Sequence, residues 1–306
     1  MVRTGVTPPR PRPPRPVRRT RRSVVYRRRL VALGVVAAGF LIAWFAVGAV
    51  RGGGGHEEPQ TTRALIPPRP FRVVFPEGFT REQMAERVGA VAQIAARERG
   101  RKPRLAPEPY LLATSRPRRE RGFGAQRLPL EGFLFPATYE FTARTTSAQL
   151  VAQQLTAFRR NWAKLNLGYA RSKNLTPYDL LTIASMVEKE TLSPDERRLV
   201  AAVIYNRLHE RMPLGIDATL RYGLHIPPTE SIRRSQLENP SPYNTRKRLG
   251  LPPTPIANPG LASLEAAAHP ARVDYLYFVR KPDKTHHFFT ASFAAFEQYK
   301  AEHGYP

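Results

Sequence analysis

The chain has no cysteine among its 306 residues. A disulfide scaffold, a thiolate metal site and a cysteine nucleophile are therefore excluded. Other signatures of chemistry are also missing. The sequence has no His-x-x-His or His-Glu-x-x-His spacing for a metal, no Gly-x-Ser-x-Gly nucleophile elbow and no glycine-rich phosphate loop. We therefore predict neither a metal nor an organic cofactor.

Acidic residues are scarce, because 24 Asp and Glu stand against 49 Lys and Arg, for a net charge of +25. Such a balance predicts an anionic partner, which is usually nucleic acid or a membrane. Residues 1–29 contain eleven arginines and no acidic residue. The rest of the chain therefore contains 38 basic and all 24 acidic residues, so it is basic as well. Neither part carries an RNA-recognition, zinc-finger or helix-turn-helix signature, so we predict no nucleic-acid partner.

One uncharged segment, Leu30–Val50, is 21 residues long. As a helix it would cross the roughly 30 Å hydrocarbon core of a bilayer. Arginine-rich sequence precedes it, and four glycines and two glutamates follow it. The positive-inside rule then places the N-terminus in the cytoplasm and the bulk of the chain outside. A cleaved signal peptide is the alternative, but the apolar run is long for one and Val47-Gly48-Ala49 is a weak cleavage site.

The composition divides the chain into five parts. We predict a disordered Arg/Pro-rich cytoplasmic tail at 1–29, a transmembrane helix at 30–50, a linker at 51–70, a small subdomain with a basic insertion at 71–127 and a larger domain at 128–306. The small subdomain begins with a strand at Phe71, and Thr80 starts its helix as N-cap. Residues 100–127 are basic, rich in proline and weakly periodic, so we predict a mobile insertion there.

The larger domain shows clear helix starts. Apolar periodicity predicts a helix at 147–165, and Thr176 and Ser193 each precede a proline and an acidic residue, as helix N-caps do. Residues 213–262 are rich in Pro, Gly and Asn and are predicted to be mostly loop. Two strands, Tyr275–Val279 and His287–Thr290, precede a final helix at about 291–302. His286 and His287 are then expected on opposite faces of a strand.

The sharpest chemical feature is Ile183–Thr191, IASMVEKET. On a helix that starts at Thr176, Leu181, Ala184 and Glu188 share one otherwise apolar face. Partial burial and the negative helix C-terminus both disfavour ionisation of Glu188. A carboxyl group that keeps its proton is what a general acid for glycosidic cleavage needs near neutral pH. The pattern alone also allows a capping role or a buried ion pair with an arginine.

Several other polar residues are candidates for substrate binding, each with a structural alternative. Glu190 lies about 200° round the helix from Glu188, so it cannot act on the same substrate atom. Asp217 is either a second carboxylate or a turn residue. Tyr205 and Asn206, inside a helix, either orient substrate or hold a loop. The loop residues Tyr243 and Asn244 either bind sugar or make turns.

The sequence resembles the bacterial endolytic murein transglycosylase (YceG-like) family. The matching motifs occur in family order and cover most of residues 71–290. They are FPEG (Phe75–Gly78), LEGFLFPATY (Leu130–Tyr139), IASMVEKET (Ile183–Thr191), VIYNRL (Val203–Leu208), IDATLRYG (Ile216–Gly223), SPYNT (Ser241–Thr245) and GLPPTPIANPG (Gly250–Gly260), followed by the AAAHP and YLYFV segments.

The resemblance implies an α+β protein of the inner membrane: a single transmembrane helix, a small LysM-like subdomain and a mixed α/β catalytic domain. Such enzymes cleave nascent peptidoglycan strands between N-acetylmuramic acid and N-acetylglucosamine, leave 1,6-anhydromuramic ends and end strand elongation. The essential acid/base carries over to Glu188, and the membrane-bound peptidoglycan synthases are the expected partners. The expected substrate-binding residues are Glu190, Tyr205, Asn206, Asp217, Thr219, Tyr243 and Asn244.

Three positions depart from the family pattern. Gly215 stands where Gln is usual, Ala218 where Pro is usual, and Arg246 where an aromatic residue is common. These departures lie in the segments 214–219 and 243–246, where the resemblance implies glycan contacts. Two other functions remain open: a peptidoglycan hydrolase with Asp217 as its second carboxylate, and a non-enzymatic membrane protein that binds peptidoglycan.

The arginine asymmetry around Leu30–Val50 generates a topology prediction. Reporter fusions placed after Gly55 and at the C-terminus should both score as extracytoplasmic, since the positive-inside rule retains the arginine-rich side in the cytoplasm. N-terminal sequencing of the mature protein supplies the control for cleavage. A cytoplasmic C-terminus, or a mature protein that begins just after Ala49, would contradict the prediction.

Overall fold

The computed structural model describes residues 70–305, which belong to one unit by their internal contacts. The predicted tail at 1–29, the predicted membrane helix at 30–50 and the predicted linker up to residue 69 lie outside the described residues. Between residues 70 and 305, no helix is both long and apolar enough to span a bilayer.

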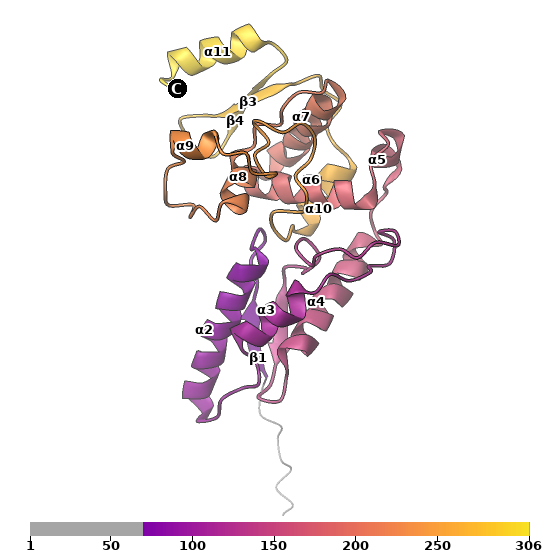
Figure 1. Cartoon of the computed structure of the whole chain (residues 1–306), viewed down its shortest axis with the longest axis vertical. Helices are drawn as coiled ribbons and strands as arrows, with labels where there is room; N and C mark the ends of the chain where they lie inside the picture. The colour runs from indigo at the N-terminus through magenta and orange to yellow at the C-terminus, as the bar shows by residue number, and fades with distance from the viewer. Residues whose placement is uncertain (1–69, 306) are drawn as a thin grey trace, which may run out of the picture. The chain divides into compact units, whose positions relative to one another are not determined.

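The first group of elements is built on a small antiparallel sheet. Strand β1 (Phe71–Val74) pairs with β2 (Thr138–Phe141), and Val73 lies opposite Tyr139. The strand alternates as predicted, because Val73 is buried whereas Val74 is 51% exposed. Helices α2 (Arg81–Arg99) and α3 (Pro107–Ser115) lie between the two strands in sequence (Figure 1). Strand β1 lies in the predicted small subdomain (71–127), whereas β2 lies in the predicted larger domain (128–306). The sheet therefore connects the two predicted parts of the chain.

Capping boxes set the starts of the longer helices in this group. Thr80 accepts a hydrogen bond from the backbone of Gln83, and the Gln83 side chain bonds back to the Thr80 backbone. Thr146 and Gln149 repeat the arrangement at the start of α4 (Ser147–Trp162). Each pair satisfies backbone N–H groups that the first helical turn leaves without partners. The predicted N-cap at Thr80 is thus confirmed.

The segment predicted to be a mobile insertion, residues 100–127, instead contributes to the core. It contains helix α3, and Leu105, Tyr110 and Phe123 are each at most 5% exposed. The Tyr110 hydroxyl donates to Gln154 Oε1 on α4 at 2.7 Å. Sequence periodicity missed this packing because the apolar residues are too widely spaced to form a stripe.

The second group is helical and centres on α6 (Pro177–Glu190), whose residues from Leu180 to Val187 are all buried. Thr176 caps this helix with Pro177 at its first position and Asp179 in the capping box, as predicted. Helices α7 (Arg197–His209) and α10 (Leu261–Ala268) pack on α6, and α5 (Gly168–Ser172) contacts α10. Ser193 does not cap α7; a 3₁₀ turn, η1 (Pro194–Glu196), leads into that helix instead.

The remaining elements lie within and after the loop-rich region at residues 213–262. That region contains two short helices, α8 (Asp217–Gly223) and α9 (Arg234–Leu237), which the prediction of mostly loop did not include. Strands β3 (Tyr277–Arg280) and β4 (His287–Thr290) form an antiparallel hairpin, followed by α11 (Phe293–Glu302). His287 is 5% exposed and bonds Glu196, whereas His286 is exposed beside Asp283. The described residues therefore have the mixed α and β structure that we predicted.

The aromatic packing of residues 100–127 makes a stability prediction. The Phe123 ring lies 4.8 Å from that of Phe133 and 4.7 Å from that of Trp162, measured between centroids. Phe123→Ala should lower the free energy of unfolding by about 3–5 kcal/mol, because it removes a buried ring and leaves a cavity. Leu112→Ala, at a side chain that is 59% exposed, should change it by no more than about 0.5 kcal/mol. Urea denaturation of the purified protein measures both, and equal effects would mean that the segment does not pack in solution.

Candidate active site

Glu188 lies in the last turn of α6, where three parts of the chain meet. Its side chain is half-buried, and its Oε2 atom accepts a hydrogen bond from the backbone N–H of Gly260 at 2.9 Å. Gly260 is the N-cap of α10 and ends the GLPPTPIANPG motif. The bond fixes one carboxylate oxygen and thereby orients the group that the sequence analysis selected.

The FPEG turn forms a second wall of this site. Gly78 has φ of +76°, a conformation that favours glycine. A Cβ atom added at Gly78 would lie 3.4 Å from Glu188 Cγ, so the turn and the acid are in close contact. Lys189 Nζ donates to the Gly78 carbonyl at 3.3 Å. The turn that leads into α2 is therefore attached directly to the end of α6.

Asn258 holds the turn, the LEGF segment and the proline-rich loop together. Its side-chain oxygen accepts from the backbone N–H groups of Gly132 and Leu134, both at 2.9 Å. Its side-chain nitrogen donates to the Phe79 carbonyl at 2.9 Å and to Glu131 Oε1 at 2.6 Å. All four hydrogen-bonding positions of the amide are used, and the residue is completely buried.

Glu131 is a buried acid that the sequence analysis did not single out. Burial raises its pKa to about 7, against the lowering effects of the Arg81 backbone N–H and the Tyr222 hydroxyl, while the charge of Glu82 raises it further. Its carboxyl group bonds the Arg81 N–H, Asn258 and Tyr222. Because the side chain is buried and both of its oxygens accept hydrogen bonds, we assign Glu131 to the scaffold of the site.

Glu77, in the FPEG turn, is the second acid that sequence reasoning missed. Its carboxylate lies against the backbone of Gly260, in the space that a Cβ atom there would occupy. Burial raises the pKa of Glu77, the charge of Glu188 raises it further, and Arg197 lowers it. The only sequence signal was an acid inside a Pro-Glu-Gly turn, which local pattern analysis explains as turn chemistry.

Glu190 and Asp217 form a separate group. Burial raises the pKa of Glu190 to about 7, and the charge of Asp217 adds to that effect, whereas Arg280, the Ala218 backbone N–H and Arg246 lower it. Asp217 is bound by Arg246 Nη2 at 2.6 Å. The hydrolase alternative expected Asp217 as the second carboxylate of the site, but the acid that the structure places next to Glu188 is Glu77.

Tyr205 and Asn206 are engaged inside the protein. The Tyr205 hydroxyl donates to the Ala267 carbonyl at 3.0 Å, which joins α7 to α10. Asn206 Nδ2 donates to the carbonyls of Val273 and Tyr275, both at 2.9 Å. The Asn206 bonds correspond to the alternative that the sequence left open, in which the residue holds a loop, whereas the Tyr205 bond joins two helices.

The remaining candidates also bond within the loops. The Thr219 hydroxyl donates to the Ile216 carbonyl at 2.7 Å, and Asn244 Nδ2 donates to two carbonyls of residues 237–239; both side chains are fully buried. The Tyr243 hydroxyl shares a hydrogen bond with Thr254 at 2.9 Å but is only half-buried. Of these three, Tyr243 alone has a surface that a substrate could contact.

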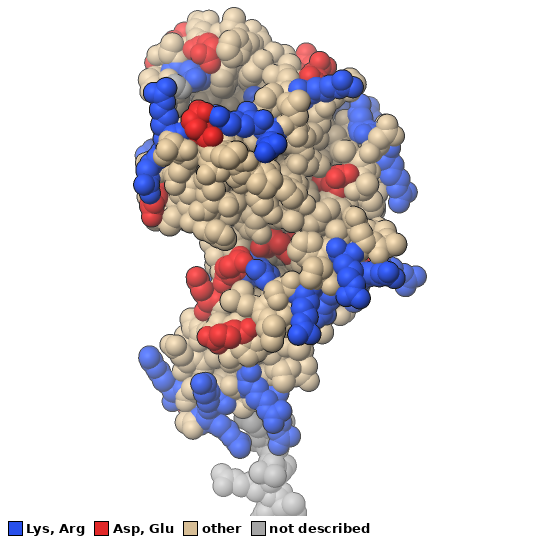
Figure 2. Space-filling view, viewed as in Figure 1, with Lys and Arg blue, Asp and Glu red and all other residues tan. Residues whose placement is uncertain are grey.

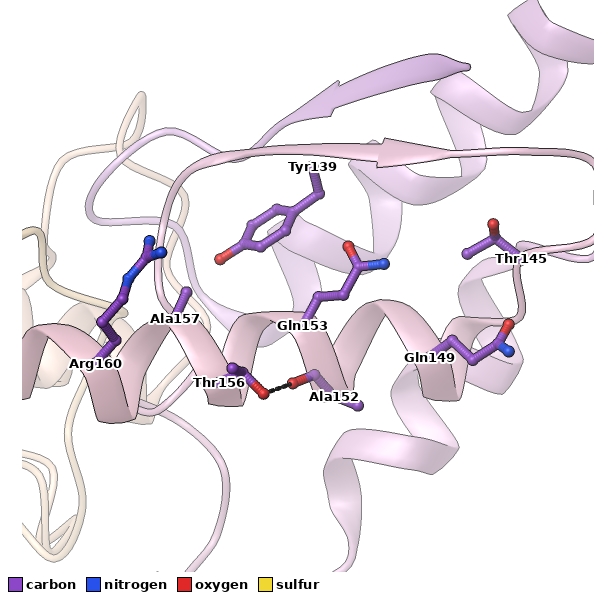
Figure 3. Close-up of a pocket in the computed structure, with 8 residues that line it drawn as sticks. All are labelled: Tyr139, Thr145, Gln149, Ala152, Gln153, Thr156, Ala157 and Arg160. Atoms are coloured by element: carbon purple, nitrogen blue, oxygen red, sulfur yellow. Dashed lines mark hydrogen bonds between the residues drawn. The ribbon is translucent and has the colours of Figure 1, made fainter. Parts of the chain in front are cut away.

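The part of the chain that the structure describes includes two shallow grooves. One, of about 640 Å³, lies between α4 and β2 and contains no carboxyl group, so it offers no general acid (Figure 3). It is lined by Tyr139, Thr145, Gln149, Ala152, Gln153, Thr156, Ala157 and Arg160. The other, of about 580 Å³, includes Arg197 and Ala262 together with Lys164, Arg198 and His269. This second groove also contains Glu265, but its charged side chains are mainly basic, and it shares Arg197 with the surroundings of Glu77.

Charge is unevenly distributed along α2. Glu82 lies in its first turn, and Arg97 and Arg99 lie in its last turn. Figure 2 shows acidic side chains near the start of this helix, on the side of the site, and basic side chains at its opposite end.

Within residues 70–305, no group of three His, Asp or Glu side chains is placed to hold a metal ion.

Comparison with known proteins agrees with these motifs. The chain is 41% identical over 155 residues to the endolytic murein transglycosylase of Bacillus subtilis (strain 168), covering 50% of this chain and 42% of that protein. It is 35% identical over 251 residues to the endolytic murein transglycosylase of Streptococcus pneumoniae (strain ATCC BAA-255 / R6), covering 74% of this chain and 42% of that protein. The matches thus span about two fifths of the length of these curated relatives.

The fold is similar to a solved structure as well. A crystal structure of a yceG-like protein from Listeria monocytogenes superposes with a TM-score of 0.63 at 30% identity, covering 76% of each chain. The YceG-like family model matches residues 55–302, which is most of the chain. This protein therefore belongs to the YceG-like family.

Proposed function

We propose that this protein is an endolytic lytic transglycosylase of peptidoglycan. It cleaves nascent glycan strands between N-acetylmuramic acid and N-acetylglucosamine, forms 1,6-anhydromuramic ends and so terminates strand elongation. Family membership and the activity for which the Bacillus and Streptococcus relatives are named, endolytic murein transglycosylase, support the reaction class. The observation that carries the assignment is the placement of Glu188, a half-buried acid oriented by the Gly260 N–H where three family motifs meet.

The reaction needs only one carboxyl group at the scissile bond. Glu188 donates its proton to the leaving glycosidic oxygen while the muramic ring develops oxocarbenium character. The resulting carboxylate then takes the proton of the muramic 6-hydroxyl as that oxygen attacks the anomeric carbon. The attack is intramolecular, so its high effective molarity replaces an activated water. Because Gly260 holds Oε2, the Oε1 atom is the one left to exchange the proton.

The substrate class fits the charge around the site. The stem peptides of peptidoglycan carry carboxylates, and the groove beside the site presents Lys164, Arg197 and Arg198. A basic groove next to a glycosidic acid suits an anionic glycan rather than a neutral one.

We assign the β1–α2–α3–β2 unit, Phe71–Phe141, as the LysM-like subdomain on the basis of its strand–helix–helix–strand order.

We also propose that the enzyme works outside the cytoplasm while tethered to the inner membrane by residues 30–50. The support is the apolar run and the arginine asymmetry of the sequence. Tethering would raise its effective concentration toward membrane-bound peptidoglycan synthases, which supply emerging strands. These synthases are the partners that the proposed reaction implies.

A peptidoglycan hydrolase is the second candidate function. One observation favours it, because Glu77 places a second carboxyl group beside Glu188 and hydrolytic glycosidases use two carboxyl groups. The two reactions leave different ends. Mass spectrometry of the products separates them, because an anhydro end is one water lighter than a hydrolysed end.

The assignment predicts the behaviour of Glu188→Gln. The amide keeps the shape of the side chain but cannot donate the proton, so cleavage of glycan strands should fall by about 10²–10⁴. Glu210→Gln, at an exposed acid after α7, should retain full activity. Thermal unfolding should show both variants folded. A folded Glu188→Gln protein with near-normal activity would remove Glu188 from the mechanism.

The tether makes a separate prediction. A flexible linker of about twenty residues would span roughly 5–6 Å × √n, so the enzyme would reach only strands close to the membrane. Deleting the gene should lengthen the glycan strands of the cell. An exported domain without residues 30–50, produced at matched abundance, should restore strand length poorly. Full restoration by that domain would show that proximity to the membrane is not needed.

A further inference from the structure

Arg197, the first residue of α7, has a half-buried side chain. Its Nε atom is buried without a hydrogen-bond acceptor, and the side chain forms neither a hydrogen bond nor an ion pair with any residue from 70 to 305. A buried N–H group without an acceptor is unfavourable for folding, because it has lost its bonds to water and gained none in return. Such a group is rare in a folded protein and indicates a role other than packing.

Other arginines of the domain show the contrast. Arg207, half-buried on the same helix, donates to three backbone carbonyls at 2.6–3.2 Å. Arg159 on α4 is bound by the buried carboxylate of Glu120 at 2.9 Å. The fold supplies acceptors to these two guanidinium groups and supplies none to Arg197.

Arg197 lines the groove of about 580 Å³ described above. The charged side chains of this groove are Lys164, Arg197, Arg198 and Glu265, so positive charge prevails. Apart from His269, the rest of its lining is apolar and consists of Leu165, Pro194, Ala262 and Ala266. The lining therefore suits a ligand that carries a carboxylate on a chain with small apolar side chains.

The groove and the proposed catalytic acid share their neighbours. The charge of Arg197 acts on Glu77, and the Glu77 carboxylate lies against Gly260. Gly260 in turn donates its N–H to Glu188 Oε2 at 2.9 Å. Ala262, in the first turn of the helix that Gly260 caps, lines the groove. A substituent on a sugar bound at Glu188 would thus have a basic groove within its surroundings.

The chemistry of Arg197 narrows the ligand to an oxyanion. A guanidinium group presents its N–H donors in a planar fork, which matches the two oxygens of a carboxylate. The stem peptide of peptidoglycan is attached to the muramic residue, which is the residue on one side of the proposed scissile bond. It carries carboxylates and small alanine side chains, as the lining of the groove requires.

We propose that Arg197, with Lys164 and Arg198 beside it, binds a carboxylate of the stem peptide at the cleavage site, so that the enzyme prefers strands that still carry their peptides. The peptide supplies the acceptor that the protein does not supply to the guanidinium group. This inference rests on the proposed function and adds to it the part of the substrate that is recognised.

The test compares the full-length protein on two substrates, which are purified glycan strands with stem peptides and the same strands after an amidase has removed them. The unaltered protein should cleave the peptide-bearing strands with a kcat/KM about tenfold higher. Arg197→Gln should raise the KM for these strands about tenfold and leave kcat unchanged, because it removes binding that does not change during the reaction. Its kinetics on peptide-free strands should match those of the unaltered protein.

Three further variants check the assignment. Arg197→Lys keeps the charge without the fork and should restore part of the affinity. Glu265→Gln removes the acid of the groove and should lower the KM for peptide-bearing strands about twofold, opposite in direction to Arg197→Gln. Arg101→Gln, at an exposed arginine just after α2, loses the same charge and should behave as the unaltered protein.

Thermal unfolding separates binding from a structural role. Arg197→Gln removes a buried donor that has no acceptor, so the variant should unfold at the same temperature as the unaltered protein or at a higher one. A lower unfolding temperature, together with an equal loss of activity on both substrates, would overturn the proposal. Better cleavage of peptide-free strands would also overturn it, since Arg197 would then bind the lactyl carboxylate that the amidase exposes.

Calorimetric titration with a free N-acetylmuramyl peptide, which has no bond to cleave, keeps this inference apart from the proposed function. The peptide should bind the unaltered protein and bind Arg197→Gln about tenfold more weakly. Inorganic phosphate that binds as tightly as the peptide would overturn the proposal in favour of a phosphate site. If the peptide binds through Arg197 but no strand is cleaved, the proposed function alone fails. If both kinds of strand are cleaved equally well and Arg197→Gln changes nothing, this inference alone fails.

Discussion

The buried amide of Asn258 is the interaction on which the site depends. It bonds the Phe79 carbonyl, the N–H groups of Gly132 and Leu134, and the carboxyl group of Glu131. These partners come from the FPEG turn and the LEGF segment, and Asn258 itself lies in the loop that leads to Gly260. A shorter or apolar side chain would leave several buried polar groups without partners. Through this amide, the fold brings Glu77 and Gly260 to the end of α6.

The acids near the site differ in role because they differ in partners. Glu131 is buried and fully hydrogen-bonded, so it supports the scaffold. Asp217 is neutralised by Arg246 and lies beside Glu190. Glu188 has one fixed oxygen and a half-exposed surface, which leaves the other oxygen available to a substrate. The partners of each carboxyl group, rather than its residue type, thus distinguish Glu188 as the one that we propose for proton transfer.

Prediction from sequence succeeded where the signal is local. The Thr176 capping box, the Thr80 N-cap and the hairpin of β3 and β4 are each coded by neighbouring residues. It failed at residues 100–127, because Phe123 and Tyr110 pack on partners distant in sequence. Tyr205 and Asn206 were ambiguous for the same reason, since their bonds go to segments more than sixty residues away.

The sequence by itself determined the helix that presents Glu188, the apolar face beneath it and the motifs that identify the family. Capping and periodicity fix a helix through contacts within one or two turns, so a single segment carries that information. Only the tertiary structure decided which second acid lies beside Glu188. A pairing of Glu77 with Glu188 depends on the hydrogen bonds of Asn258 and on the missing side chain of Gly260. No local pattern records these contacts, because each joins segments separated by dozens of residues or more.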